Sequence, residues 1–410
     1  MLPPPPMKLA LLLCLALAPV LSAADLAPPR VFSFSGQSLA AAKASLQRGE
    51  TALVPARDEL LKEADRLLAH RPASVMDKTK VGVSGDMHDY YSQAPYWWPD
   101  PSKPDGKPFL RRDGAVYPDS KIGTDSVAFA RTCNAVETLG LAYYFSGKEV
   151  YAEKAALLAR VWFLNPETRM NPHLNYGQAV PGRSSGREEG VLEARHLAGL
   201  TDGLTLLSGA NAWTADDAAR LTDWLSRYYE WLTHAPVALK ERAAKNNHGS
   251  WYDAQTAHLA LFLGRTDDAR RIVEEARTVR VARQIEPDGT QPLEFARTKS
   301  LDYCVFNLSA LLRLCTVARN AGVDLYPFRT SDGRSIREAL LRVAPYADPE
   351  KVWPKKDLVQ EERAHLPALM AQALTFGTDS DLESQLQRRL AARPDASARW
   401  RLLWAPEPSP

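Results

Sequence analysis

Hydrophobic residues recur at helical spacing along most of the chain. Within 298–320, for example, Leu301, Cys304, Leu308 and Cys315 fall on one continuous apolar stripe. Turns containing Gly, Pro, Asn or Asp separate such segments, and strand-like alternation is scarce. The pattern therefore predicts an all-α protein. Helical segments are predicted at 36–49, 51–70, 124–146, 148–164, 187–208, 214–235, 251–263, 266–282, 298–320, 334–345, 357–374 and 380–392.

Amphipathic helices must bury their apolar stripes against one another, because no sheet is available to cover them. Antiparallel helix pairs arranged as an α/α toroid, or incomplete α/α barrel, would bury these stripes. No strict sequence repeat is visible, so closure into a ring goes beyond what the periodicity alone indicates. We predict one such domain over residues 24–410, with long loops available for a site.

The N-terminal residues have the pattern of a secretion signal. Lys8 precedes an almost wholly apolar run from Leu9 to Leu21, and small residues follow at 22–24. The run is shorter than the roughly 20 residues that span a bilayer. We therefore predict a signal peptide at residues 1–23, and a secreted or periplasmic mature protein that is not held in the membrane. The proline run at 3–6 is unusual for a signal and makes Met7 a candidate start.

Cysteine usage and charge narrow the class of protein further. Cleavage of the signal would remove Cys14 and leave Cys133, Cys304 and Cys315, an odd number that excludes a fully paired set of internal disulfides. No CxxC motif, HExxH motif or close histidine pair is present, so we expect neither a metal nor a cofactor. A formal net charge of +2 gives no general attraction for nucleic acid. We also expect a monomer.

Two long stretches, 71–123 and 165–186, interrupt the helical rhythm, and loops of this length are usually functional or disordered. The first contains a concentration of aromatic residues, whose flat faces can pack against sugar rings. The alternative is a hydrophobic brace that folds the loop onto the helices. The candidate sugar-binding residues are Tyr90, Tyr91, Tyr96, Trp97 and Trp98.

The second long stretch carries amides and arginines between glycines and prolines. Arginine suits a carboxylate because its planar fork donates two parallel hydrogen bonds. The alternative is that the amides cap the loop and the arginines are solvated. The candidate binding residues are Asn175, Tyr176, Gln178, Arg183 and Arg187.

The segment 245–253 crowds polar groups into a predicted turn before an apolar helix. Asn246, Asn247, His248 and Tyr252 provide amides, an imidazole and a phenol within seven residues. Packing does not require this combination. The alternative is a capped helix entrance with a structural histidine.

About fifty residues later, Arg297 and Tyr303 add a guanidinium and a second phenol. Together with His248 they offer a proton acceptor, a proton donor and a neutraliser for an anion. Tyr303 could instead be a half-buried packing residue beside the apolar stripe. His196, which follows an arginine in a helical segment, is a further candidate for substrate contact or a core residue.

Four spaced motifs resemble the alginate lyase superfamily of polysaccharide lyases: the Asn-Asn-His-Gly segment 246–249, the stretch 96–101, the loop 171–187 and the segment 297–303. The resemblance extends over roughly 80–390. It is closer to the bacterial families that cleave mannuronate-rich alginate or glucuronan, because Arg297 and Tyr303 are six residues apart. The resemblance implies an α/α toroid with a groove or tunnel and metal-free β-elimination that leaves unsaturated uronate ends.

Removal of the weakly acidic C5 proton of a uronate requires its carboxylate to be neutralised, since the transition state resembles an enolate. Arg297 and Asn247 are the candidates for that role. His248 is assigned as the base or as a carboxylate partner, because an ordinary histidine has a pKa of about 6.5. Tyr303 is assigned as the acid that protonates the departing O4, or as both acid and base.

Two other classes remain open at this point. A glycoside hydrolase on a similar toroid would need two convergent carboxylates. Asp89, Asp100, Glu188, Glu189 and Glu294 are available for that purpose. A binding protein for acidic polysaccharides would keep the aromatic groove without catalysis.

Overall fold

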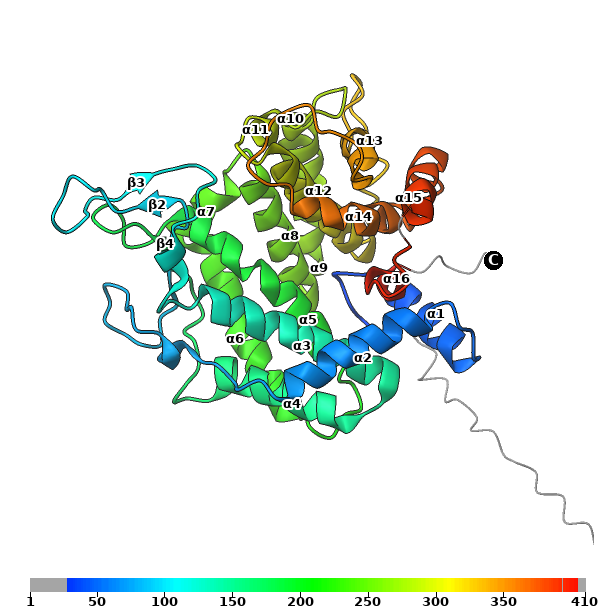
Figure 1. The fold of residues 1–410 in the computed structure, drawn as a ribbon. Helices are drawn as coiled ribbons and strands as arrows, with labels where there is room; N and C mark the ends of the chain where they lie inside the picture. The colour runs from blue at the N-terminus through cyan, green and yellow to red at the C-terminus, as the bar shows by residue number, and fades with distance from the viewer. Residues whose placement is uncertain (1–27, 393, 405–410) are drawn as a thin grey trace, which may run out of the picture.

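The computed structural model describes residues 28–392 and 394–404, so the predicted signal peptide lies outside the described residues. The regular structure of the described part is almost all helix, with only four short strands, which confirms the all-α prediction (Figure 1). The helices are α1 (Gly36–Gln47), α2 (Val54–Leu68), α3 (Ser126–Ser146), α4 (Glu149–Ala159), α5 (Leu197–Thr205), α6 (Ala215–His234), α7 (Pro236–Arg242), α8 (Asn247–Phe262), α9 (Thr266–Ala276), α10 (Ala282–Gln284), α11 (Pro292–Phe295), α12 (Ser300–Asn320), α13 (Ile336–Val343), α14 (Leu366–Leu374), α15 (Ser380–Ala392) and α16 (Trp400–Leu403).

Four helices, α3, α5, α8 and α12, pack side by side as an inner layer. Helix α3 packs against α5, α5 against α8, and α8 against α12. Outer helices cover this layer, with α4 on α3, α9 on α8 and α13 on α12 (Figure 1). The turns that join α3 to α4 and α8 to α9 span only a few residues, so each pair is antiparallel. This is the paired-helix arrangement of an α/α toroid.

Helix α12 lies at the centre of the packing. Its apolar stripe, including Leu301, Leu308 and Leu311, is fully buried, as the periodicity indicates. The helix is long and apolar enough to cross a membrane by composition alone, but 78% of its most apolar window is buried inside the protein. It is therefore a core helix of the toroid.

The structure differs from the sequence-based prediction at several helix boundaries. Helix α8 begins at Asn247 instead of 251, so the predicted turn is the first turn of the helix. The short helices α7 and α11, each with a proline in its first turn, were not predicted. The segment 188–196 is a 3₁₀ helix, η5 (Glu188–His196), before α5.

Two pairs of short strands hold the long loops. Strand β1 (Tyr91–Gln93) pairs in parallel with β4 (Tyr176–Ala179), which joins the two loops that interrupt the helices. Strand β2 (Trp97–Trp98) pairs antiparallel with β3 (Leu110–Arg111), and this hairpin projects from the helical body at the left of Figure 1. These strands are too short to show alternation in the sequence.

Glycines allow β4 to lie directly on η5. A Cβ added to Gly190 would come within 2.5 Å of the backbone of Gly177, a distance that real Cβ atoms do not show. The close approach places the second long loop against the 3₁₀ helix that carries several polar side chains toward the centre of the molecule.

A buried charge stabilises the start of α6. Asp217 forms a capping box with Thr214 and accepts two hydrogen bonds from Arg160, at 2.9 and 2.6 Å. The hydrogen bonds from Arg160 hold the pKa of Asp217 well below its usual range. A depressed pKa stabilises the fold above the unfolded pKa of about 3.9, and this contribution is lost as the pH falls below that value.

We expect Asp217→Asn to lower the free energy of unfolding by about 2 kcal/mol at pH 7, because hydrogen bonds to a charged group are lost. Urea unfolding at pH 7 and pH 3 measures the effect, and the difference from wild type should shrink at pH 3. Asp216→Asn in the same turn is the control, since Asp216 is 77% exposed in its side chain and should change little. An equal loss at both pH values would contradict the assigned role of the charge.

Candidate active site

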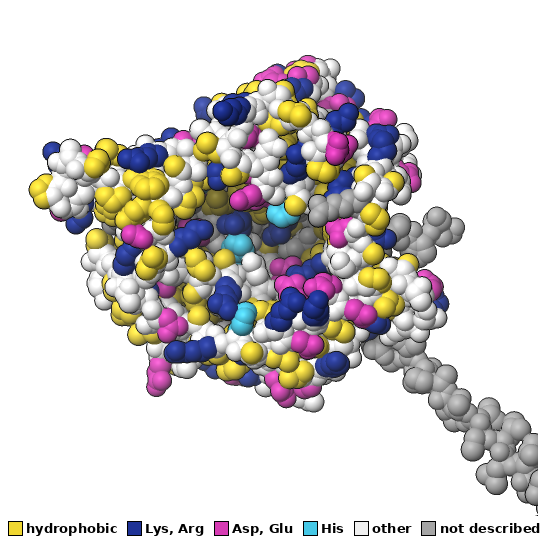
Figure 2. All heavy atoms as spheres, viewed as in Figure 1, with side chains coloured by type: hydrophobic (Ala, Val, Ile, Leu, Met, Phe, Trp, Pro, Cys, Tyr) yellow, Lys and Arg dark blue, Asp and Glu magenta, His cyan; other side chains and the backbone are white. Residues whose placement is uncertain are grey.

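A cavity of about 650 Å³ opens where strand β2, η5, α7 and the first turns of α8 and α12 meet. Figure 2 shows the molecule hollowed near the middle of this face, with Lys, Arg and His side chains at the edge of the hollow and inside it. The structure brings together nine of the predicted site residues in the wall of this cavity. They are Tyr96, Trp97, Gln178, Arg187, Asn246, Asn247, His248, Arg297 and Tyr303.

His248 is oriented by a carboxylate from the unpredicted helix α7. Its Nδ1 lies 2.7 Å from Oε1 of Glu241, whose side chain is only 1% exposed. Burial alone would lower the pKa of His248, but the charge of Glu241 and the hydrogen bond to it outweigh burial and raise the pKa above its usual value. With Nδ1 donating to Glu241, Nε2 is the nitrogen left to exchange a proton with a ligand.

Asn247 is held by a second buried carboxylate. Its backbone N–H and its Nδ2 donate to the two oxygens of Glu294, at 2.6 and 2.7 Å. Asn247 is fully buried, so its side chain fixes the first turn of α8 against α11. Asn246 caps the same turn, because its Oδ1 accepts a hydrogen bond from the N–H of His248.

Arg297 joins three parts of the chain. Its Nε and Nη2 donate to Asp113, which follows β3, at 3.2 and 2.7 Å. The same Nη2 lies 2.7 Å from the hydroxyl of Tyr303, and the guanidinium stacks 3.7 Å from the centre of the Tyr303 ring. Tyr96 completes the group, since its hydroxyl lies 2.9 Å from that of Tyr303.

The Tyr303 phenol is stabilised in its neutral form. Burial and the neighbouring Tyr96 raise the pKa of Tyr303, and the Arg297 charge offsets only part of that rise. A neutral phenol can donate a proton. Arg297 is placed to stabilise the phenolate that remains after donation, because it bonds the same oxygen.

Trp97 and Arg187 line the cavity together, and Arg183 lies on the same tryptophan from outside it. The guanidinium groups of Arg183 and Arg187 lie 5.4 and 5.5 Å from the Trp97 ring centre. Arg187 is also ion-paired with Glu189, so its charge is partly neutralised. Gln178 adopts a left-handed backbone with φ of 47°, a conformation that non-glycine residues rarely take outside functional or strained positions.

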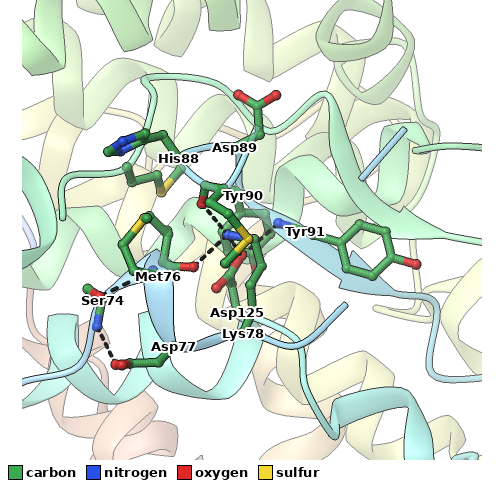
Figure 3. Close-up of polar contacts among 12 residues, drawn as sticks. Ser74, Met76, Asp77, Lys78, His88, Asp89, Tyr90, Tyr91 and Asp125 are labelled. Carbon is green, nitrogen blue, oxygen red and sulfur yellow. Dashed lines mark hydrogen bonds and ion pairs between the residues drawn. The ribbon is translucent and has the colours of Figure 1, made fainter. Parts of the chain in front are cut away.

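Tyr90 and Tyr91 illustrate why adjacent aromatics do not share a surface. Successive side chains of an extended strand point to opposite faces, and Figure 3 shows these two diverging. Tyr90 is 0% exposed and donates to Glu193, so the structure places it in the core and not in a substrate subsite. The segment is held by Lys78, which forms a buried ion pair with Asp125 at 3.2 Å.

Tyr252 is a second predicted binding residue that lies in the core. It is 3% exposed and donates its hydroxyl to the carbonyl of Leu232 at 2.8 Å. These contacts follow from the start of α8 at Asn247, which turns Tyr252 away from the cavity. The prediction that Tyr90 and Tyr252 contact the substrate is therefore wrong, because both side chains are buried in the core.

The remaining predicted residues lie around the cavity without lining it. Tyr91 and Arg183 line a neighbouring surface cavity of about 630 Å³. Trp98 donates Nε1 to the carbonyl of Ala115, and Tyr176 pairs with Tyr91 in the β1–β4 sheet. Asn175 accepts from Trp231 Nε1 at the exposed edge. His196 is half-buried and contacts Asn134 at 3.0 Å.

The residues that sequence reasoning missed are mainly the partners of those it found. Glu241, Asp113 and Arg195 were not singled out, and Glu294 was considered only as a possible hydrolase acid. A buried carboxylate has no local signature, because its burial depends on which elements pack over it. The one available signal was a glutamate seven residues before a candidate histidine, which one short helix and a tight turn bring into contact.

Comparisons with known proteins agree with this geometry. The family model described as alginate lyase matches residues 74–353. The crystal structure of an alginate lyase from Bacteroides ovatus is 38% identical in sequence, with a TM-score of 0.87 over 92% of this chain and 99% of that one. A tyrosine-to-phenylalanine variant of alginate lyase A1-III complexed with a tetrasaccharide is 19% identical, with a TM-score of 0.54 over 95% and 100% of the two chains. The search of curated proteins gives no match.

The fold and the matched family define a polysaccharide lyase built on an α/α toroid. The chain belongs to the alginate lyase family, whose model covers more than half of it.

The His248–Glu241 contact predicts a measurable titration. We expect Glu241→Gln to lower the pKa of His248, because the group that offsets burial loses its charge. NMR titration of the imidazole signals at constant salt measures the change. Glu230→Gln is the matched control, since Glu230 contacts the exposed His234 and should leave His248 unchanged. An unaltered His248 pKa in Glu241→Gln would show that the carboxylate does not set it.

Proposed function

We propose that this protein cleaves a uronic-acid polymer by β-elimination and leaves unsaturated uronate ends. The observation that carries the proposal is the meeting, in one cavity, of an imidazole backed by Glu241 with a neutral phenol backed by Arg297. These groups supply a proton acceptor and a proton donor, which are the two partners that elimination needs.

In the proposed reaction the guanidinium of Arg297, in the wall of the cavity, also neutralises the carboxylate of the uronate so that its C5 proton can leave. Nε2 of neutral His248 takes the C5 proton, and the electrons of that bond form the C4–C5 double bond as the C4–O4 bond breaks. Tyr303 donates its proton to O4, and Arg297 stabilises the resulting phenolate. Glu241 stabilises the imidazolium that forms, as a buried acid does for a histidine base. Proton exchange with solvent then restores both groups.

A hydrolase on this site is less consistent with the contacts. Hydrolysis needs two carboxyl groups free to act on either side of the bond. Glu241, Glu294 and Glu189 each bind a neighbouring side chain, namely His248, Asn247 and Arg187. These three carboxylates therefore serve as partners of the polar groups, and Glu188 is the one other glutamate in the described wall of the cavity, which leaves a hydrolase short of its second carboxyl group. A site that only binds polysaccharide would not need an imidazole held by Glu241 facing the same cavity as a neutral phenol.

We propose alginate as the polymer, with mannuronate-rich alginate as the better substrate and glucuronan as the alternative. The support for alginate is the 38% identity to the Bacteroides ovatus alginate lyase. The support for the finer choice is the six-residue Arg297–Tyr303 spacing, which resembles families that act on these polymers. We further propose that the protein acts in the periplasm or outside the cell, on the basis of its N-terminal sequence, and that it acts as a monomer.

We expect Tyr303→Phe to lower turnover by roughly 10²–10⁴-fold with little change in substrate affinity, as is typical when a general acid is lost. The assay is the ultraviolet absorbance of the unsaturated product on polymannuronate, polyguluronate and glucuronan. The activity of wild type should persist in EDTA, because protein side chains supply every charge that the proposed reaction needs.

Tyr252→Phe is the matched control, since it removes a buried phenol hydroxyl that donates to the carbonyl of Leu232 and does not line the cavity. It should keep near-normal turnover. Near-normal turnover of a folded Tyr303→Phe protein would overturn the assigned acid. New reducing ends without ultraviolet absorbance in wild type would replace elimination with hydrolysis.

A further inference from the structure

A second group of cations, Arg195 and Arg313, lies next to the catalytic residues, around the ring of Trp251. Arg195 on η5 lies 5.5 Å from the ring centre of Phe306 and 6.0 Å from that of Trp251. The guanidinium of Arg313 on α12 lies 5.4 Å from the centre of the same Trp251 ring. The two aromatic rings contact each other at 5.1 Å. The two arginines, from η5 and α12, therefore lie against one tryptophan from α8.

The cluster continues from the catalytic cavity. Arg195 and Phe306 line that cavity, and Arg313 lies farther along α12. Phe306 and Arg313 are seven residues apart, so they share one face of the helix. The ten residues from Tyr303 to Arg313 correspond to about 15 Å along the helix axis. Arg195, Phe306 and Arg313 are partly exposed, whereas Trp251 and most of α12 are buried.

Neither arginine has an ion-pair partner among residues 28–392 and 394–404. The only hydrogen bond from Arg195 goes to the carbonyl of Leu192 at 3.3 Å, and Arg313 makes none within the same ranges. Desolvation lowers the pKa of both guanidinium groups. Contact with an aromatic face leaves the edge of a guanidinium free to donate hydrogen bonds.

Two of the carboxylates near the cluster accept hydrogen bonds from other groups and are weakly charged, and none forms an ion pair with either arginine within residues 28–392 and 394–404. Glu193 accepts hydrogen bonds from Tyr90 and Ser92, and burial raises its pKa to about 7. Asp202 accepts two backbone N–H groups of the N-terminal segment, and burial raises its pKa to about 7 as well. Glu137 and Glu362 interact with the arginines only at longer range. His196 and His258 add no charge at neutral pH, since burial lowers the pKa of each to about 3.

We propose that Arg195 and Arg313 form a further subsite for carboxylate groups, which binds uronate units remote from the cleaved linkage. This inference rests on the proposed function and extends it to substrate length. A partly buried cation without a partner is costly, and the carboxylate of a bound polymer would neutralise it. Arg195 takes the unit nearer the catalytic residues, and Arg313 takes a unit deeper in the toroid. Longer oligomers therefore gain affinity from Arg313, and the shortest do not.

The test measures calorimetric binding of mannuronate oligomers of increasing length, with Tyr303→Phe as the background to slow cleavage. We expect Arg313→Gln to weaken binding of long oligomers by about ten- to a hundred-fold and to leave the disaccharide unchanged. Arg195→Gln should weaken shorter oligomers also. The same oligomers with carboxyl groups reduced to alcohols should bind wild type and both variants equally.

Arg319→Gln is the matched control, because Arg319 lies on the same helix, 4.8 Å from the ring of Phe376 on the exposed side. It should bind every oligomer as the background does. If the Arg313→Gln and Arg195→Gln proteins bind oligomers of every length as tightly as the Tyr303→Phe background does, the subsite is overturned. An equal loss of affinity for charged and for reduced oligomers would overturn it too, because such a loss indicates packing and not recognition of carboxylates. If Arg313→Gln does not fold, Arg195→Gln decides.

The outcomes separate this inference from the proposed function. Oligomer binding that depends on both arginines, without unsaturated product from wild type, would support the subsite and reject the elimination. Cleavage to unsaturated ends with affinity independent of both arginines would reject the subsite alone. No binding of any uronate oligomer by wild type would reject both.

Discussion

The Arg297 guanidinium contacts Asp113 and Tyr303 at the same time, and the geometry of the cavity depends on that double contact. Asp113 belongs to the projecting hairpin, whereas Arg297 and Tyr303 flank the start of α12. A half-buried cation that lost either partner would be left with unpaired donors, at a cost of several kcal/mol at most. The Arg297–Asp113 ion pair thus ties the end of the hairpin to the start of α12, and the same guanidinium offsets part of the rise in the Tyr303 pKa that burial and Tyr96 cause.

The catalytic cavity of a protein that acts on a polyanion contains several glutamates, which at first looks unfavourable. Their contacts explain them. Glu241 increases the basicity of His248, and Glu294 fixes the turn that carries it. Glu189 neutralises part of the charge on Arg187. Glu241, Glu294 and Glu189 therefore orient and tune the polar residues that face the substrate, whereas Arg195 and Arg313 form no ion pair within the part of the chain that the structure describes.

The sequence predicted the helices well, because apolar spacing records which face of a helix is buried. The motifs also identified nine residues that the structure places in the wall of one cavity. It failed where the signal is tertiary. Helix α7 spans only seven residues, too few for periodicity to register, so Glu241 went unnoticed. Tyr90 shares the aromatic composition of its neighbours, and only the alternation within β1 and the loop before it sends its ring into the core.

The central claim is that bond cleavage begins with loss of the C5 proton. A uronate polymer labelled with deuterium at C5 tests it directly, with the label followed by mass spectrometry of the products and NMR of the solvent. The account predicts that one deuterium passes to solvent for each linkage cleaved, that is for each unsaturated end formed, and that the unsaturated unit carries none at C5. Full retention of deuterium at C5 in the products would contradict it, because no elimination can occur without breaking that bond.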